Sequence, residues 1–441
     1  MKKILAYILC VVLSGATAFS RGEKSYCNRT LRIDYIFSGT DSTTQIALGQ
    51  LSSFEGWAGR THNMDSLPLK GNGQIVMRDA KSSEVLYMNS FSTLFQEWQC
   101  TEEAVRIRRS FENVFLLPMP LEKVIVSVEL FGFKGERTAY FEHEVDPADI
   151  LIRERALTDA PYRYLLHSGP STECIDIAIV AEGYVSSEAE LFFKDATLAM
   201  NEILSYEPFA SLRDNFNFIA VAPSSKESGV SIPSEGDWKD TALGASFSTF
   251  YSDRYLTTLH LNKLHDVLSG LPYEHIIILA NTDNYGGGGI YNSYTLTTAH
   301  HPLFRPVVVH EFGHSFAGLA DEYYYDDQYV DQYYPQVEPW EQNISTLVDF
   351  ASKWQELLPE GRSCWDGPLF QPTDPVDSKV LWKAIENGSD PSSFIGVYEG
   401  AGYQSKGVYR GYPDCRMKSN EAPVFCPICQ DAIRRLIEFY L

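Results

Sequence analysis

Apolar and polar residues alternate along the first third of the chain. The segments 30–36 (TLRIDYI) and 123–130 (KVIVSVEL) have a period of two, which is typical of half-buried β-strands. Turn formers separate such runs, as in 39–41 (GTD) and 70–73 (KGNG). The pattern predicts an all-β sandwich domain over residues 19–160.

The pattern changes after a connecting segment at about 156–172. Short apolar runs at 175–184, 217–223 and 275–280 predict buried strands. Helices are expected between them, the first from a capping box at Ser187 and Glu190 to about Tyr206, and the second at about 251–268. Strands that alternate with helices predict an α/β layer, which we assign to a second domain over residues 161–441.

The first 18 residues have the features of a secretory signal peptide. Lys2 and Lys3 form a basic start, an apolar stretch covers 4–13, and Ala16-Thr17-Ala18 is a cleavage site of the A-x-A type. We therefore expect an exported protein that is periplasmic, bound at the cell surface or secreted. No later segment approaches 18 continuous apolar residues, so no membrane span is expected.

Charge and cysteine content narrow the partners and the redox chemistry. A formal charge of −22 repels phosphate backbones and argues against a nucleic-acid partner. Export permits disulfides, although their connectivity cannot be read from the sequence. Cys426 and Cys429 form a C-x-x-C motif, and the chain lacks the second pair that a four-cysteine zinc site would need. This favours structural disulfides over a metal knuckle or a redox pair.

The segment 310–323 (HEFGHSFAGLADEY) carries the candidate chemistry. On a helix, His310 and His314 are separated by about 40° of rotation and ~6 Å of rise, so both imidazoles lean toward one point. A zinc ion at roughly 2.0–2.1 Å from each nitrogen fits there. Glu311 is one step round the helix, near the metal without ligating it, where a general base takes a proton from water. A solvated or ion-paired cluster is the alternative, but polar groups without partners are costly on an apolar helix.

Zinc needs a third protein ligand and an open position for water. Gly318 can adopt a positive φ and end the helix, so that the chain turns back beneath the metal. Asp321 is the predicted third ligand, and Glu322, equally anionic, is the alternative. The tyrosines at 323–325 offer a hydrogen-bond donor to the oxyanion of the transition state.

These residues resemble the IgA-peptidase (igalysin) group of zinc metallopeptidases, in which His-Glu-x-x-His is followed by Gly-Leu-x-Asp-Glu-Tyr. That group is related to the metzincins, and Asp321 keeps the metzincin spacing of three residues after Gly318. The sequence departs from the metzincin pattern in one respect, because Gly318 comes four residues after His314 rather than three. The resemblance implies a metzincin-like fold, a Zn²⁺ cofactor and peptidase activity.

The resemblance extends to segments on either side of the helix. The segment 412–417 (YPDCRM) is similar to a Met-turn, in which a methionine, here Met417, packs beneath the metal. The segment 286–296 (GGGGIYNSYTL) resembles the edge strand above a metzincin cleft, which receives an extended peptide by strand addition. The β-rich region and the last helix are similar to the N-terminal domain and the C-terminus of the family.

The sequence therefore predicts an α/β metzincin-like zinc peptidase domain preceded by an all-β sandwich domain. The expected function is that of a secreted zinc-dependent endopeptidase, with zinc on His310, His314 and Asp321 and with Glu311 as the base. Its substrate is a protein or peptide, a host or dietary glycoprotein being one candidate. Two alternatives stay open. One is a non-enzymatic surface protein that binds glycan or protein and has a structural metal, and the other is a metal-dependent amidase of cell-wall peptides.

Overall fold

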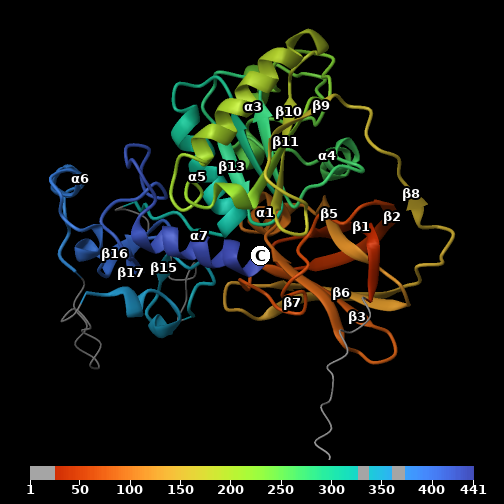
Figure 1. Cartoon of the computed structure of the whole chain (residues 1–441), viewed down its shortest axis with the longest axis horizontal. Coiled ribbons are helices and arrows are strands. Elements are labelled where there is room, and N and C mark those ends of the chain that lie inside the picture. Colours follow the sequence, from red (N-terminus) through yellow and green to blue (C-terminus); the bar gives the residue numbers. More distant parts are fainter. Residues whose placement is uncertain (1–24, 326–336, 360–372) are drawn as a thin grey trace, which may run out of the picture.

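The computed structural model describes residues 25–325, 337–359 and 373–441. The expected signal segment at 1–18 and Cys364 lie outside these described residues. Within them, no helix combines the length and the apolar character that crossing a bilayer requires. The described chain forms an N-terminal β-rich domain, a six-stranded sheet with helices, and a C-terminal part around a three-stranded sheet (Figure 1).

Two four-stranded sheets make up the N-terminal domain, with the strand orders β5-β1-β2-β8 and β4-β3-β6-β7. The first sheet consists of Tyr26–Gly39 (β1), Thr44–Glu55 (β2), Arg109–Pro120 (β5) and Arg153–Glu154 (β8). The second consists of Gly73–Asp79 (β3), Val85–Phe91 (β4), Val124–Phe131 (β6) and Arg137–Val145 (β7). Adjacent strands are antiparallel except for the short parallel pair of β2 and β8. The period-two segments of the sequence thus form strands, as predicted.

The two sheets share one hydrophobic core, to which alternate side chains of β1 contribute. Leu31 and Ile33 of this strand are fully buried in it. Two short helices, α1 (Leu94–Gln99) and α2 (Glu102–Arg106), connect β4 to β5. The alternation predicted an all-β region, and these two helices show that the region is not purely β. Thr93 caps α1 by accepting a hydrogen bond from the N–H of Gln96, which stabilises its first turn.

The polar face of β1 is buried as well, against the second domain. The guanidinium of Arg32 is fully buried and donates to Asp34 Oδ1 and to Asp266 Oδ1, each at 2.6 Å. Asp266 lies on α4 (Leu261–Val267) of the second domain. The prediction of a half-buried strand was therefore wrong for β1, because the other domain covers the face that carries the polar residues.

The central sheet of the second domain has six strands in the order β13-β14-β12-β10-β11-β9. They are Tyr162–His167 (β9), Ile175–Glu182 (β10), Phe216–Val221 (β11), His275–Ala280 (β12), Gly287–Ile290 (β13) and Tyr294–Thr298 (β14). Four of them, β10, β11, β12 and β14, are parallel, and the edge strands β9 and β13 are antiparallel to their neighbours. The three apolar runs of the sequence form β10, β11 and β12, as predicted.

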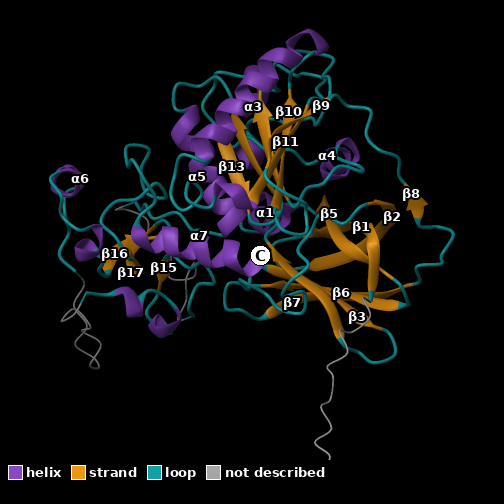
Figure 2. Cartoon of the chain, in the orientation of Figure 1, coloured by secondary structure: helices purple, strands orange, loops and turns teal. Residues whose placement is uncertain are grey.

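Both faces of this sheet are buried, which explains the unbroken apolar runs. Ile177 and Ile179 of β10 contact the core beneath the helices α3 (Ala189–Ile203) and α5 (Phe304–Ala317). Ala178 and Val180 belong to the core that the sheet shares with α4 and the N-terminal domain. Figures 1 and 2 show α3 and α5 on one side of the sheet and α4 on the other.

Three local predictions in this domain differ from the structure. The connecting segment contains β9, because its residues pair with β11 at the sheet edge. The helix α3 begins only at Ala189, because residues 186–188 form a 3-10 turn in which the carboxylate of Glu188 accepts from the N–H of Val185 at 2.9 Å. The predicted helix at 251–268 forms only as α4, because a bridge between Ser246 and Thr257 holds the preceding residues in a loop.

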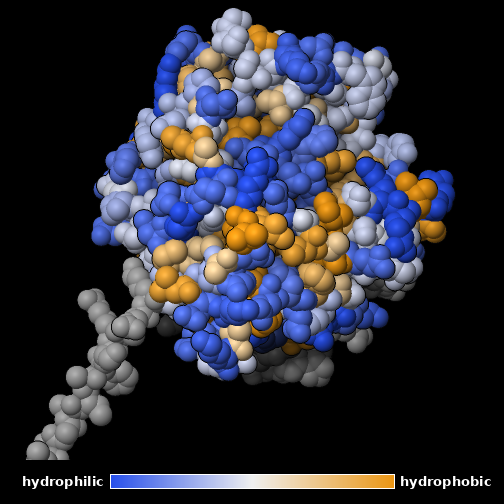
Figure 3. All heavy atoms as spheres, turned by 90° about the vertical axis from the view of Figure 1, so that its right-hand side faces the viewer, coloured by the Kyte–Doolittle hydropathy of each residue, from blue (hydrophilic) through white to orange (hydrophobic). Residues whose placement is uncertain are grey.

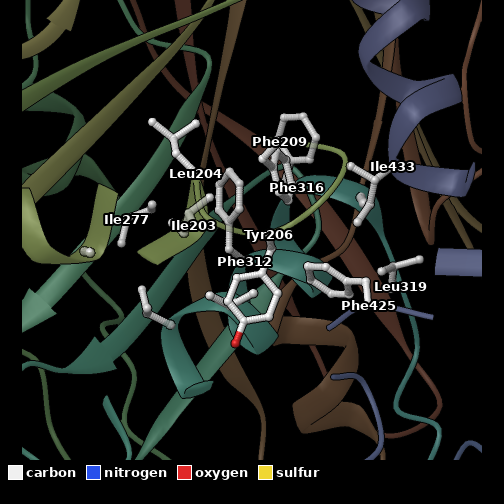
Figure 4. Close-up of a cluster of buried hydrophobic side chains, with 14 of the residues drawn as sticks. Ile203, Leu204, Tyr206, Phe209, Ile277, Phe312, Phe316, Leu319, Phe425 and Ile433 are labelled. Carbon is white, nitrogen blue, oxygen red and sulfur yellow. The ribbon is translucent and has the colours of Figure 1, made fainter. Parts of the chain in front are cut away.

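The C-terminal part packs against α5 through apolar side chains. Its elements are Ile344–Ser345 (β15), Ser378–Glu386 (α6), Tyr398–Ala401 (β16), Gln404–Arg410 (β17) and Pro427–Tyr440 (α7), and its sheet has the order β15-β17-β16. Figure 4 shows Phe312 and Phe316 of α5 beside Phe209, Phe425 and Ile433 in one apolar cluster. Short 3-10 turns lie at Ser186–Glu188, Arg213–Asn215, Pro233–Glu235, Thr249–Tyr251, Phe350–Ser352, Gln355–Leu357 and Pro391–Phe394.

The side of the molecule on which β2 and β8 lie is largely hydrophilic. Figure 3 shows it with apolar side chains in separate groups among polar ones. Exposed apolar residues such as Ile150, 94% exposed, and Leu151, 77% exposed, lie in the segment before β8. Scattered apolar residues of this kind are normal on the surface of a folded protein.

The cluster between α5 and α7 predicts a large cost for cavity formation. Ile433→Ala removes a fully buried side chain, so we expect the free energy of unfolding to fall by about 2–5 kcal/mol. The same change at Ile150, which is 94% exposed, should alter it by less than about 0.5 kcal/mol. Guanidinium chloride unfolding of both variants measures the difference, and equal effects would contradict this packing.

Candidate active site

The helix α5 presents His310, Glu311 and His314 away from its apolar core side. Val308 and Phe312 of the same helix are fully buried in the core, whereas the two imidazole side chains retain 15% and 16% exposure. The helix ends at Gly318, which has a φ of 58° and donates its N–H to the carbonyl of His314 at 2.9 Å. A glycine suits this left-handed end because it has no Cβ.

The turn that follows the helix is held by hydrogen bonds to distant segments. The side chain of Asn343 accepts from the N–H of Ala320 and donates to its carbonyl, both at 2.8 Å. The N–H of Glu322 donates to the carbonyl of Met417 at 2.8 Å. These contacts fix the peptide unit that joins Asp321 to Glu322, and so they set the direction of both carboxylates.

Asp321 lies beside the two histidines, and Glu322 does not. The distance from Asp321 Oδ1 to Nε2 of His310 is 3.0 Å, and that to Nε2 of His314 is 3.2 Å. The two Nε2 atoms are 3.0 Å apart. The carboxylate of Glu322 contacts cysteines of the C-terminal part instead. Of the two carboxylates that the sequence left as candidates, the structure brings only Asp321 to the histidines.

Hydrogen bonds to the backbone fix the tautomers of the two imidazoles. Nδ1 of His310 lies 2.9 Å from the carbonyl of Arg416, and Nδ1 of His314 lies 2.6 Å from the carbonyl of Leu319. Because a carbonyl only accepts, each Nδ1 carries the proton and each Nε2 of a neutral ring offers a lone pair. Such bonds at the far nitrogen are typical of metal-binding histidines.

Three acceptors thus converge on one point, and a divalent cation of the zinc type fits between them. Asp321 Oδ1 is buried and has no hydrogen-bond donor among the described residues. Ligand atoms on a tetrahedral zinc ion with bonds of roughly 2.0–2.1 Å are about 3.3 Å apart. The measured separations of 3.0–3.2 Å are close to that value.

Electrostatics couples the same three groups. Burial acts to lower the pKa of His314, but the charge of Asp321 outweighs it and raises the pKa to about 9. Burial acts to raise the pKa of Asp321, but the charge of His314, and with it that of His310, holds this pKa far below its usual range. The site therefore attracts positive charge, whether as a proton or as a metal cation.

Glu311 lies between the histidines and the edge strand β13. A Cβ placed on Gly287 would lie 3.5 Å from Glu311 Oε1, so the carboxylate is in contact distance of this strand. Burial raises the pKa of Glu311, although the charges of the two histidines act in the opposite direction. A raised carboxyl pKa suits a group that takes up a proton near neutral pH.

The glycines of β13 allow this strand to approach α5 closely. A Cβ on Gly289 would lie 2.2 Å from the carbonyl oxygen of Glu311 and 2.8 Å from Cβ of His314. One on Gly288 would lie 2.7 Å from the ring of Tyr255. The resemblance implied an edge strand for residues 286–296, of which only β13 is the edge of the sheet, while β14 is the next strand inward.

The side chain of Asp321 also contacts a tyrosine, Tyr403, which the sequence did not indicate. The hydroxyl of Tyr403 donates to Asp321 Oδ2, and its ring packs edge-on against Tyr323 at 5.3 Å. Tyr324 and Tyr325 are 36% and 44% exposed. Tyr403 is 82 residues from Asp321 along the chain, and no motif in the sequence indicated their contact.

The N-terminal domain also supplies a residue near the histidines. The carboxylate of Glu97, on α1, accepts a hydrogen bond from the hydroxyl of Tyr255. Glu97 is close enough to interact electrostatically with His314 and Glu311. Glu97 is an exposed residue of a short helix, and no motif around it in the sequence indicated that it lies near the histidines.

Met417 packs beneath α5, where the similarity to a Met-turn places it. This residue is fully buried, and a Cβ on Gly313 would lie only 2.7 Å from its sulfur atom. Gly313 stands between the two histidines on the helix. The absence of a side chain there lets the thioether contact the backbone of the helix directly.

Two family models match the chain. The one described as IgA Peptidase M64 matches residues 164–373 and 378–437, and the one described as Peptidase M64 N-terminus matches residues 22–142. No curated protein matches the chain. The first match contains the histidine helix, the turn after it and the C-terminal cysteines.

The close approach of β13 to α5 predicts that a single methyl group disturbs the site. In Gly289→Ala the Cβ overlaps the backbone of Glu311, so we expect a loss of about 1–3 kcal/mol in stability and weaker retention of metal. Unfolding curves and the zinc content after dialysis measure both effects. Gly132→Ala is the control, because the atoms nearest to its Cβ belong to the carboxylate of Glu136, at the end of a flexible side chain that can turn aside. Equal behaviour of the two variants would refute the close packing.

Proposed function

The chain belongs to the M64 family of IgA peptidases, as the resemblance indicated, and from this premise we propose that it is a zinc-dependent endopeptidase. Membership makes the chain a peptidase, which acts on proteins or peptides. The finer assignment rests on one observation, the convergence of His310, His314 and Asp321 beside the carboxylate of Glu311.

Two imidazole nitrogens and one carboxylate oxygen are the donor set that we propose for the metal. Zinc binds such nitrogen and oxygen ligands in three-residue catalytic sites and keeps one position open. When bound, zinc supplies a Lewis acid that polarises a peptide carbonyl and lowers the pKa of water toward 7. The backbone carbonyls that hold each Nδ1–H keep the imidazoles oriented for this task.

Glu311 is the proposed general base. Its carboxylate takes a proton from the attacking water at one Oε atom and then delivers it to the nitrogen of the leaving amine. Burial raises its pKa, which favours both halves of this transfer, since the protonated form must persist until the C–N bond breaks. The contact with β13 limits the motion of the carboxylate and holds it on the side where the substrate would lie.

The substrate is proposed to bind as an extended strand beside β13. An edge strand has one side without a neighbour in its sheet, and peptides are recognised there by backbone hydrogen bonds. The glycines at 287–289 present little side-chain bulk, which supports close approach of a peptide backbone. Recognition through the backbone suits cleavage within chains, and it does not assign IgA as the substrate.

Tyr403 is proposed as a positioning residue for Asp321. By donating to Oδ2, its hydroxyl leaves Oδ1 directed at the histidines.

Export by the signal at 1–18 is also part of the proposal, and it would bring the peptidase to proteins outside the cytoplasm.

Loss of the base should stop hydrolysis without loss of metal. In Glu311→Gln we expect kcat to fall by about 10²–10⁴-fold, because the amide accepts no proton, while the zinc content stays unchanged. Cleavage of fluorescent casein and of a random peptide library, together with elemental analysis, measures both quantities. Glu235→Gln, an exposed carboxylate remote from the histidine helix in sequence, is the matched control.

Two results would contradict the assignment. Turnover at the wild-type rate in Glu311→Gln would remove Glu311 from the mechanism. Cleavage of cell-wall peptides by the wild-type protein, with no cleavage of casein or of any library peptide, would favour an amidase instead.

Treatment with a chelator should abolish the activity, and added zinc should restore it.

Removal of the Tyr403 hydroxyl should weaken the hold on the metal. In Tyr403→Phe we expect the zinc affinity to fall about 10–100-fold, because Asp321 loses a donor that orients it. Zinc-buffered titrations measure the affinity, and kcat at saturating zinc should return toward the wild-type value. Tyr162→Phe, at an exposed tyrosine, is the control. An unchanged zinc affinity in Tyr403→Phe would exclude a positioning role.

A further inference from the structure

A second cluster of metal-ligating side chains lies behind the first, in the C-terminal part. Glu322, Cys415, Cys426 and Cys429 are all buried, and one ligand atom from each lies within 4.8 Å of the others. They come from three segments, which are the turn after α5, the segment before Met417, and the start of α7. None of the six cysteines that the structure describes is disulfide-bonded.

The separations within this cluster are those of a tetrahedral metal site. Sγ of Cys415 and Sγ of Cys429 are 3.7 Å apart, and two sulfurs on a tetrahedral zinc ion with bonds of about 2.3 Å are about 3.8 Å apart. Glu322 Oε1 lies 3.1 Å from Sγ of Cys429 and 4.0 Å from Sγ of Cys426. These values lie on either side of the ~3.6 Å expected between oxygen and sulfur ligands.

In the described part of the chain, the buried carboxylate of Glu322 lacks one of its hydrogen-bond partners, and a nearby cation would supply the positive charge that this carboxylate needs. Glu322 is fully buried, and its Oε2 has no hydrogen-bond partner among the described residues. The N–H of Cys426 donates to Sγ of Cys415 at 3.1 Å, and Asn343 donates to Glu322 Oε1 at 3.0 Å. Both bonds stabilise negative charge on a ligand atom.

Positive charge lies close to the cluster. Cys426 and Cys429 lie at the N-terminal end of α7, where the helix dipole stabilises anions. Arg410 and Lys418 are close enough to interact electrostatically with Glu322. Three thiolates and one carboxylate around a dication leave two negative charges, which these two cations balance.

We propose that Glu322, Cys415, Cys426 and Cys429 bind a second zinc ion in a closed structural site. A disulfide accounts for the cluster less well, because it would join two of the thiols and leave the third thiol and the carboxylate buried together. A metal ion engages all four groups at once. The second half of the site that the C-x-x-C motif lacked in the sequence is supplied by Cys415 and Glu322.

The second site supports the first through one peptide unit. Asp321 and Glu322 are adjacent, so a metal on Glu322 holds the turn that directs Asp321 to the histidines. The same metal would tie α7 and the segment that ends at Met417 to this turn. Only this supporting role rests on the proposed function, and the binding of the second ion does not.

Counting metal ions tests the proposal on the full chain after removal of the signal. Native mass spectrometry and elemental analysis of the wild-type protein should give two zinc ions per chain. A double variant, His310→Ala with His314→Ala, should retain one ion. Cys429→Ser should also retain one, whereas Cys174→Ser, a buried thiol outside the cluster, should keep both.

Cobalt substitution identifies which ion is held by sulfur. The His310→Ala, His314→Ala protein loaded with Co²⁺ should show thiolate-to-cobalt charge-transfer absorption, and Cys429→Ser should lose this band. Glu322→Gln provides a second variant that leaves all the thiols in place, and its affinity for the cobalt in this site should fall by at least tenfold.

The outcomes separate this proposal from the proposed function. A single zinc ion that disappears in the double histidine variant would overturn the second site and leave the first. A single ion that persists in that variant would do the reverse. A disulfide among Cys415, Cys426 and Cys429, found by mass spectrometry of the unreduced wild-type protein, would also overturn the proposal.

Discussion

The approach of two imidazole nitrogens and one carboxylate oxygen to within 3.2 Å of one another is the constraint on which the rest of the site depends. Three acceptors in a buried place are unfavourable unless positive charge lies among them. The helix alone supplies two of them, and the third arrives only because Gly318 ends α5 and Asn343 holds the turn. The cysteine cluster on the other side of the same peptide unit adds a second anchor to that turn.

The surroundings of Glu311 and His314 depend on how closely the backbone of β13 approaches α5. A Cβ on Gly287 would contact Glu311, and one on Gly289 would overlap the backbone of Glu311 and Cβ of His314, so Glu311 and one imidazole lie directly beside the sheet edge. The N-terminal domain also contributes to this region, since the carboxylate of Glu97 accepts a hydrogen bond from Tyr255, which lies beside β13. The domain is therefore more than an appended module, and its buried Arg32 network with Asp266 keeps it in place.

Several elements could be predicted because their signals are local. The apolar runs of β10, β11 and β12 and the spacing of His310 and His314 involve only a few neighbouring residues, and Gly318 could be recognised as a residue able to adopt the positive φ that ends the helix. The predicted cap of α3 and the long helix at 251–268 were wrong because nearby contacts competed. A 3-10 turn at Ser186–Glu188 precedes α3 in place of the expected cap, and the bridge between Ser246 and Thr257 holds the loop before α4. β9 was missed because an exposed edge strand has a weak pattern.

The sequence by itself determined the spacing of His310, Glu311 and His314, the strand and helix periods, and the family to which they belong, since all of these depend on neighbours along the chain. Only the tertiary structure decided that Asp321 rather than Glu322 lies beside the histidines, that Tyr403 donates to it, and that Cys415 joins Cys426 and Cys429. It also decided that the polar face of β1 is covered. The physical reason is that these contacts join segments far apart in the chain, whose meeting depends on the packing of whole domains and leaves no periodic trace in the sequence.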